Sequence, residues 1–218
     1  MKFKEMNLPN KLTTIRMFCV PFMVVLFLLM ILNQTFDLPV DYYLINDDST
    51  SLNVELSVCQ LIMVVLFAFA SITDFVDGHL ARKYNLVSDY GKLMDPLADK
   101  LLVNTTIICM MVCQMYLAQP GAEVLAIISM FCSIVVIARD IFVDALRMQA
   151  LKKNAVVPAS IWGKLKTATL MPGIVFMLLG SLNVVVYLIG LLLMSLGGIF
   201  ALIGGIKYYI DLSKYIEN

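Results

Sequence analysis

The chain has 218 residues, of which 61% are hydrophobic and 15% charged, and its mean hydropathy is +0.88. Soluble domains average about 45–50% apolar and about 25% charged residues, so this composition excludes an ordinary soluble domain and indicates a membrane protein. The formal net charge is zero. The length allows one domain of several membrane spans and leaves little for a soluble domain.

Six apolar segments are long enough to cross a hydrocarbon core of about 30 Å, which takes about 20 helical residues. They cover about residues 14–32, 55–74, 93–117, 122–146, 160–181 and 184–207. We therefore expect an all-α polytopic membrane protein with six transmembrane helices in a single domain over residues 1–218. Residues 1–13 would form a short juxtamembrane segment. No small-residue cleavage site follows Leu32, so the first segment is interpreted as a span and not as a cleaved signal peptide.

The charges alternate between the gaps that separate these segments. Residues 33–54 contain four aspartates and neither Lys nor Arg, and the gaps near residues 119–121 and 180–181 contain no basic residue. All sixteen basic residues lie near the two termini or in residues 75–100 and 139–166. The positive-inside rule then places both termini in the cytoplasm and the acidic loop outside.

Small residues recur in the last apolar segment as Gly197-x3-Ala201-x3-Gly205. Small residues four apart let two helices approach closely. The stripe is interpreted as packing within one helical bundle, and a homodimer interface stays open as the alternative.

Two other residue types are given no chemical role. The single histidine, His79, is interpreted as a surface residue of its helix. The five cysteines all lie within apolar segments and are interpreted as reduced packing residues: Cys19, Cys59, Cys109, Cys113 and Cys132.

Four aspartates lie at the ends of two neighbouring apolar segments, where charge is costly. Asp74 and Asp77 close the second segment, and Asp95 and Asp99 open the third. An ionised carboxylate at membrane depth costs about 2.5–3.5 kcal/mol on insertion scales. Two divalent cations would neutralise four carboxylates, so the set predicts a two-metal site for chemistry on a phosphate at the membrane surface.

Helical geometry gathers these carboxylates on two stripes. The first stripe lies within an arc of about 140° and contains Asp74, Asp77, Gly78, Ala81 and Arg82. The second lies within about 80° and contains Gly91, Asp95 and Asp99. Packed antiparallel, the two helices would point four carboxylates into a polar cavity that faces the cytoplasm and suits Mg²⁺ or Mn²⁺.

Ion pairing is the alternative explanation for this charge. Asp74 or Asp77 could pair with Arg82 within the membrane protein. Such pairs would not explain the two glycines, which leave room for a nucleotide to approach the backbone. The metal interpretation accounts for both features.

The spacing Asp74-x2-Asp77-Gly78-x2-Ala81-Arg82-x8-Gly91-x3-Asp95-x3-Asp99 resembles, position for position, the signature of the CDP-alcohol phosphatidyltransferases. Residues 94–100 (MDPLADK) and 7–16 (NLPNKLTTIR) are similar to the bacterial branch that uses glycerol 3-phosphate as acceptor. The resemblance covers nearly the whole chain. It implies a multi-pass enzyme of the cell membrane whose partners are CDP-diacylglycerol, glycerol 3-phosphate and the lipid bilayer, with no nucleic acid.

The resemblance also implies roles for individual residues. Two cations, Mg²⁺ or Mn²⁺, would be held by Asp74, Asp77, Asp95 and Asp99. Asp99 would also be the catalytic general base. The CDP-diacylglycerol pocket would be lined by Asn10, Thr13, Gly78, Ala81, Arg82, Ser88 and Gly91.

A second basic cluster follows in residues 139–166. Arg139 and Arg147 are eight residues apart, hence on one helical face, and Lys164 and Lys166 open the next apolar segment. Arg and Lys bind phosphate oxygens through charge-assisted hydrogen bonds. Binding of anionic lipid head groups is the better explanation for Lys152 and Lys153, but it explains Arg139 poorly, because that residue lies within apolar sequence.

The resemblance places Arg139, Lys164 and Lys166 near the acceptor phosphate, with Arg147 in support. The branch usually has Glu where this chain has Asp140, and a polar residue where it has Leu170.

The sequence therefore predicts transfer of a phosphatidyl group from CDP-diacylglycerol to glycerol 3-phosphate, with release of CMP. The nearer alternative is the same chemistry with phosphatidylglycerol, serine or an inositol phosphate as acceptor. The distant alternative is a divalent-cation carrier, which would have no use for Gly78, Arg82 and Gly91.

Overall fold

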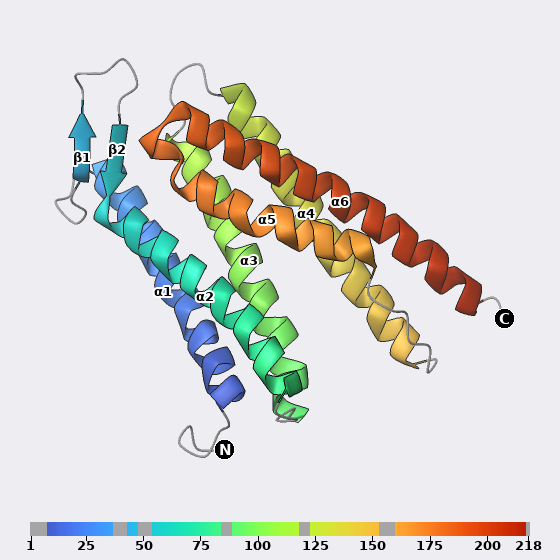
Figure 1. Ribbon diagram of the computed structural model, residues 1–218. Coiled ribbons are helices and arrows are strands. Elements are labelled where there is room, and N and C mark those ends of the chain that lie inside the picture. The colour runs from blue at the N-terminus through green and yellow to red at the C-terminus, as the bar shows by residue number, and fades with distance from the viewer. Residues whose placement is uncertain are drawn as a thin grey trace. The chain divides into compact units, whose positions relative to one another are not determined.

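The computed structural model describes residues 8–36, 43–47, 54–83, 89–117, 123–152 and 160–216. These residues form six α-helices, two short strands and one 3-10 turn (Figure 1). In chain order they are α1 (Leu8–Phe36), β1 (Tyr43–Asp47), β2 (Val54–Ser57), α2 (Val58–Lys83), α3 (Asp89–Leu117), α4 (Glu123–Lys152), α5 (Ile161–Leu178), η2 (Gly180–Leu182) and α6 (Val184–Ile216). The predicted helical fold is confirmed.

Four of the described helices are long and apolar enough to cross a bilayer. Their apolar stretches are Asn10–Asn33 in α1, Met94–Gln114 in α3, Glu123–Ala150 in α4 and Val184–Ser213 in α6. The apolar part of α2 is shorter, Val58–Asp74. Four of the six predicted spans therefore meet this criterion of length and composition, and the other two spans stay a prediction.

Large apolar side chains on these helices also face outward. Phe18 and Phe22 of α1, Phe69 of α2 and Phe131 of α4 are all exposed. An exposed apolar surface of this kind suits lipid, which has no polar groups to match.

A pair of short strands spans the end of the expected acidic loop and the start of the second apolar segment. β1 and β2 pair antiparallel, with Asp47 opposite Val54 and Asn46 opposite Glu55. Strands of five and four residues are too short to give a clear sequence period. The all-α prediction was wrong at this point.

The chain divides into two compact units. Unit 1 comprises residues 1–116 and 178–186, and unit 2 comprises residues 117–177 and 187–218. The prediction of a single domain over the whole chain stays a prediction.

In unit 1, α1 packs along α2 (Figure 1). The packed face of α2 is an apolar stripe at helical spacing, formed by the buried residues Cys59, Met63, Phe67 and Ala70. Asp74 comes one turn after Ala70 and so continues that stripe. This face of α2 is therefore apolar over most of its length and carries a charged residue, Asp74, toward the end that leads to α3.

In unit 2, the helices α5 and α6 approach so closely that glycine is required. A Cβ atom on Gly190 would lie 2.7 Å from the backbone nitrogen of Met177, and one on Gly173 would lie 3.1 Å from that of Met194. Gly197 lies against Leu170, where an added Cβ would be 3.3 Å from its Cδ1 atom. The small-residue stripe of α6 therefore packs inside unit 2, in agreement with the internal interpretation.

Candidate functional site

The first two turns of α1 carry a buried polar stripe. Asn10, Thr13 and Arg16 are spaced three apart, so they lie on one helical face, and all three are buried. Further along α1, the buried residues of the described part are Met23, Leu26 and Phe27. α1 thus presents polar groups to its neighbours at one end and an apolar face over the rest of its length.

Arg16 joins α1 to the end of α2. Its Nη1 atom donates to Asp74 Oδ1 at 2.8 Å, and its Nε atom donates to the carbonyl oxygen of Ala70 at 3.2 Å. The side chain of Arg16 is only 1% exposed, whereas that of Asp74 is 38% exposed. A buried arginine therefore fixes a carboxylate whose side chain remains partly exposed.

Thr13 joins the same helix to α3. Its hydroxyl donates to Asp95 Oδ1 at 2.5 Å. Asp95 lies near enough to Asp74 for the two negative charges to interact. Two of the four predicted aspartates, from two different helices, are thus held by neighbouring residues of α1.

The other predicted donor and metal residues are only partly described. Asp99 is half-buried in α3, one turn after Asp95. Gly91 lies in the first turn of α3. The last turns of α2 contain Asp77, Gly78, Ala81 and Arg82. The side chains at all five positions fall outside the described part. Ser88 lies outside the described residues. His79 falls in the same end of α2, so its predicted surface role stays a prediction.

The donor chemistry fits divalent cations. Asp74 and Asp95 offer carboxylate oxygens, the hard ligands that Mg²⁺ and Mn²⁺ prefer. Their contacts with α1 both use the Oδ1 atom. Among the described side chains no group of three or more acidic, His or Cys residues converges on one point, and Asp77 is not in that set. The four-aspartate metal site stays a prediction.

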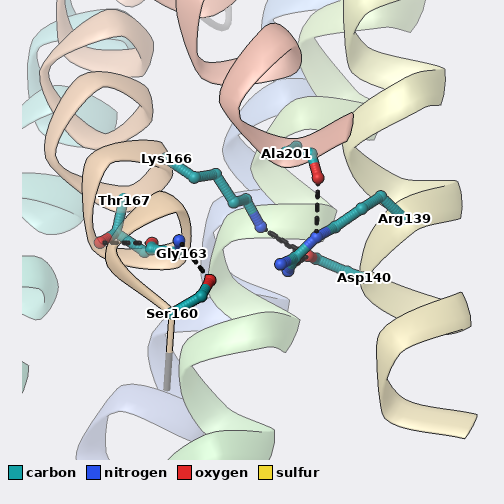
Figure 2. Close-up of polar contacts among 7 residues, drawn as sticks. All are labelled: Arg139, Asp140, Ser160, Gly163, Lys166, Thr167 and Ala201. Atoms are coloured by element: carbon teal, nitrogen blue, oxygen red, sulfur yellow. Dashed lines mark hydrogen bonds and ion pairs between the residues drawn. The ribbon is translucent and has the colours of Figure 1, made fainter. Parts of the chain in front are cut away.

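Unit 2 gathers a separate group of charged side chains, which Figure 2 shows. Lys166 of α5 donates from Nζ to both carboxylate oxygens of Asp140 in α4, at 2.6 Å each. Arg139 Nη1 donates to Asp140 Oδ1 at 3.2 Å. The side chains of Lys166 and Asp140 are 6% and 7% exposed, so this pair is closed from solvent.

Helix α6 directs the side chain of Arg139. The Nε atom donates to the carbonyl oxygen of Ala201 at 3.1 Å (Figure 2). A Cβ atom on Gly205 would lie 3.2 Å from Arg139 Cγ, and one on Gly204 would lie 3.3 Å from its Nη2 atom. The two glycines leave the space along α6 that the arginine occupies.

The remaining two predicted acceptor residues lie in other surroundings. Arg147 is exposed, and its guanidinium carbon lies 5.8 Å from the ring centroid of Tyr208, within cation–π range. Lys164 is exposed near the start of α5, where Gly163 N–H donates to Ser160 Oγ at 3.3 Å. The structure therefore brings Arg139 and Lys166 together through Asp140.

Sequence reasoning missed Arg16 as a site residue and treated it only as part of an N-terminal motif. The signal was present, because Arg16 is a charge at the start of an apolar segment. The same argument had identified Arg139. Applied evenly, it would have selected both arginines.

Comparison with known proteins gives consistent matches. The family model for CDP-alcohol phosphatidyltransferase matches residues 6–196. A protein of Rickettsia felis named CDP-diacylglycerol–glycerol-3-phosphate 3-phosphatidyltransferase is 30% identical over 214 residues, covering 97% of this chain and 98% of its own. Proteins of the same name from Rickettsia typhi and Bacillus subtilis are 32% identical over 206 residues and 37% identical over 161 residues. The first match covers 93% of this chain and 95% of the Rickettsia typhi protein, and the second covers 74% of this chain and 70% of the Bacillus subtilis protein. This chain belongs to the CDP-alcohol phosphatidyltransferase family.

Proposed function

We propose that this protein transfers the phosphatidyl group of CDP-diacylglycerol to the 1-hydroxyl of sn-glycerol 3-phosphate, giving phosphatidylglycerophosphate and CMP. Family membership supports the reaction type, and the names of the relatives support the acceptor. Among the contacts, the one that carries the proposal is the pair of carboxylates, Asp74 and Asp95, held together by α1. A divalent-cation carrier is disfavoured by family membership.

The donor half of the proposal rests on unit 1. CDP-diacylglycerol has a pyrophosphate, and Asp74, Asp77, Asp95 and Asp99 would hold two divalent cations against it. Bound there, the cations would neutralise the pyrophosphate and stabilise the charge on the departing CMP. Asn10 and Thr13 would line the donor pocket with Gly78, Ala81, Arg82, Ser88 and Gly91. Arg16 joins the set as the residue that orients Asp74.

The chemical step is an in-line substitution at phosphorus. Asp99 accepts the proton of the acceptor hydroxyl, and the oxygen forms a bond to the lipid-linked phosphorus. The bond from that phosphorus to the bridging pyrophosphate oxygen breaks, and its electron pair leaves with CMP. Positioning and charge neutralisation supply most of the rate in phosphoryl transfer, so fixed carboxylates matter more than nucleophile strength.

The acceptor half rests on unit 2. Arg139 and Lys166 are fixed on one carboxylate, and a fork of Arg N–H groups matches the oxygens of a phosphate. Lys164 and Arg147, both exposed, would add charge. Acceptors without a phosphate, such as serine, would have no need of these four cations.

The orientation is part of the proposal. The distribution of basic residues supports a multi-pass protein of the cell membrane with both termini, and the aspartates, on the cytoplasmic side. A cysteine placed at position 47 in a background without native cysteines tests this in intact cells. Labelling by an impermeant reagent before lysis is expected, and labelling only after lysis would reverse the orientation.

An acceptor panel tests the function directly. Purified protein in detergent–lipid micelles is given CDP-diacylglycerol, Mg²⁺ or Mn²⁺ and one radiolabelled acceptor at a time: glycerol 3-phosphate, phosphatidylglycerol, serine or inositol phosphate. We expect lipid-soluble label with glycerol 3-phosphate, matched mole for mole by CMP. Preference for another acceptor would keep the reaction type and overturn the assigned substrate.

A further inference from the structure

Asp140 of α4 is the point on which two cations of unit 2 converge. Both of its oxygens accept from Lys166 Nζ at 2.6 Å, and Oδ1 also accepts from Arg139 Nη1 at 3.2 Å. The three side chains come from two helices and carry a net charge of +1. Asp140 is itself almost closed from solvent, with 7% of its side chain exposed.

The contacts fix the direction of Arg139 from two sides. Its Nε atom is held by the carbonyl oxygen of Ala201 and its Nη1 atom by Asp140 (Figure 2). A guanidinium has five N–H donors, so these two bonds leave the Nη2 donors for a ligand. Without the carboxylate, Lys166 and Arg139 would repel each other, and each long side chain would lose one of the groups that fix it.

We propose that Asp140 is the positioning residue of the acceptor-phosphate site, holding Lys166 and Arg139 in the arrangement that receives the phosphate. This inference rests on the proposed function and adds a residue to it. Asp140 does not bind the substrate, because a carboxylate repels a phosphate. It acts through the two cations and confines their charge to one place.

A purely structural role is the competing explanation. Removing one partner of a buried ion pair leaves an uncompensated charge and destabilises a protein, whereas replacing both partners by neutral groups is often tolerated. The double variant Asp140→Asn/Lys166→Met therefore reports on folding, and its unfolding temperature is compared with that of Asp140→Asn. Because the double variant also lacks a phosphate-binding cation, the two roles are separated by Asp140→Asn itself: a structural role predicts that both KM values rise with a lower unfolding temperature, and a positioning role predicts that the acceptor KM rises alone.

The experiment compares initial rates of CMP release for wild type, Asp140→Asn, Asp140→Glu and the double variant. Each is assayed at saturating CDP-diacylglycerol with glycerol 3-phosphate varied, and then with the donor varied. Asp144→Asn is the matched control, since it removes a carboxylate from the same helix one turn later.

We expect Asp140→Asn and the double variant to raise the acceptor KM at least about tenfold, the loss of one charge-assisted hydrogen bond. The donor KM should change less than about twofold, because the donor half rests on other residues. Asp140→Glu should recover most of the acceptor affinity, and Asp144→Asn should match wild type.

Three results would overturn the inference: a wild-type acceptor KM in Asp140→Asn, equal rises in both KM values in Asp140→Asn, or an equal acceptor effect in Asp144→Asn. Failure of the proposed function looks different, because wild type itself would then not turn over glycerol 3-phosphate.

Discussion

The two charged regions of this molecule are built in opposite ways. In unit 1 the cation is buried and the anion is open, since Arg16 is 1% exposed and Asp74 38% exposed. In unit 2 both Lys166 and Asp140 are closed from solvent, at 6% and 7%. Each region uses a fixed group of one sign to orient a group of the other sign. The group in unit 1 is called the open region (Thr13, Arg16, Asp74 and Asp95), and the group in unit 2 is called the closed region (Arg139, Asp140 and Lys166).

The difference matches the proposed ligand of each region. An open carboxylate beside a second carboxylate is ready for cations and the pyrophosphate they would bind. The buried carboxylate of Asp140 is bonded to both Arg139 and Lys166, so the three side chains together keep a net charge of +1 that suits a phosphate.

Loss of a carboxylate from the open region should have the largest effect. Asp95→Asn should lower turnover at least about 10³-fold, because bound cations contribute several kcal/mol of charge stabilisation. EDTA should do the same to wild type. Asp99→Asn should also abolish turnover but should still bind Mn²⁺, measured by electron paramagnetic resonance. Full activity of either variant, or of wild type in EDTA, would refute the two-metal proposal.

Loss of the buried cation should come next. Arg16→Gln removes a charge-assisted hydrogen bond to Asp74, worth about 1.5–3 kcal/mol, and also the bond to Ala70 O. We expect a lower unfolding temperature in detergent and weaker Mn²⁺ binding. Arg16→Lys keeps the charge but not the two-point contact, so it should recover part of both. Unchanged Mn²⁺ affinity in Arg16→Gln would remove Arg16 from the site.

In the closed region, Arg139→Ala should raise the acceptor KM at least about tenfold, because a charge-assisted hydrogen bond to the phosphate is worth about 1.5–3 kcal/mol. Arg147→Ala is the comparison, and its effect should be smaller because Arg147 lies over Tyr208. Steady-state kinetics with each substrate varied would measure both. A loss of donor affinity with an unchanged acceptor KM would contradict the assignment of Arg139.

Packing between α5 and α6 in unit 2 gives the smallest expected effect. Gly190→Ala should destabilise the protein by about 1–3 kcal/mol, the usual cost of overpacking, because the new Cβ would meet the backbone of Met177. Gly198→Ala is its control in the same helix, where a Cβ would meet only atoms at 3.9 Å. Thermal unfolding in detergent compares the two. Equal stability would mean that α5 can move away from α6 without cost.

Much of the helical fold could be predicted from the sequence, because a bilayer imposes one strong length and composition rule. The helix α1 begins at Leu8, so residues 8–13 of the segment expected to be juxtamembrane are helical. Pro9 is compatible with this start, since a first-turn residue needs no backbone N–H partner. The β1–β2 hairpin depends on pairing between two short segments and left no local signal.

The site was predictable where chemistry follows local spacing and not where it depends on tertiary contact. The cost of charge in apolar sequence singles out Asp74 and Asp95, and the helical period predicts that they face one cavity. The structure brings the two charges within interaction range, and their metal-binding role stays a prediction. The link between Asp140 and Lys166 joins residues 26 apart in sequence, so no local pattern indicates it. From the sequence alone, Asp140 is visible only as a difference from the family pattern.

In the proposed function the carboxylates of unit 1 serve the donor and the cations of unit 2 serve the acceptor, and a crossed kinetic measurement tests this claim. Thr13→Val removes the hydroxyl that binds Asp95 in the open region, and Arg139→Ala alters the closed region. CMP release is measured over a grid of donor and acceptor concentrations for both variants. We predict that Thr13→Val impairs turnover or donor KM with the acceptor KM unchanged, while Arg139→Ala raises the acceptor KM alone. The same change in both KM values for both variants would contradict the claim.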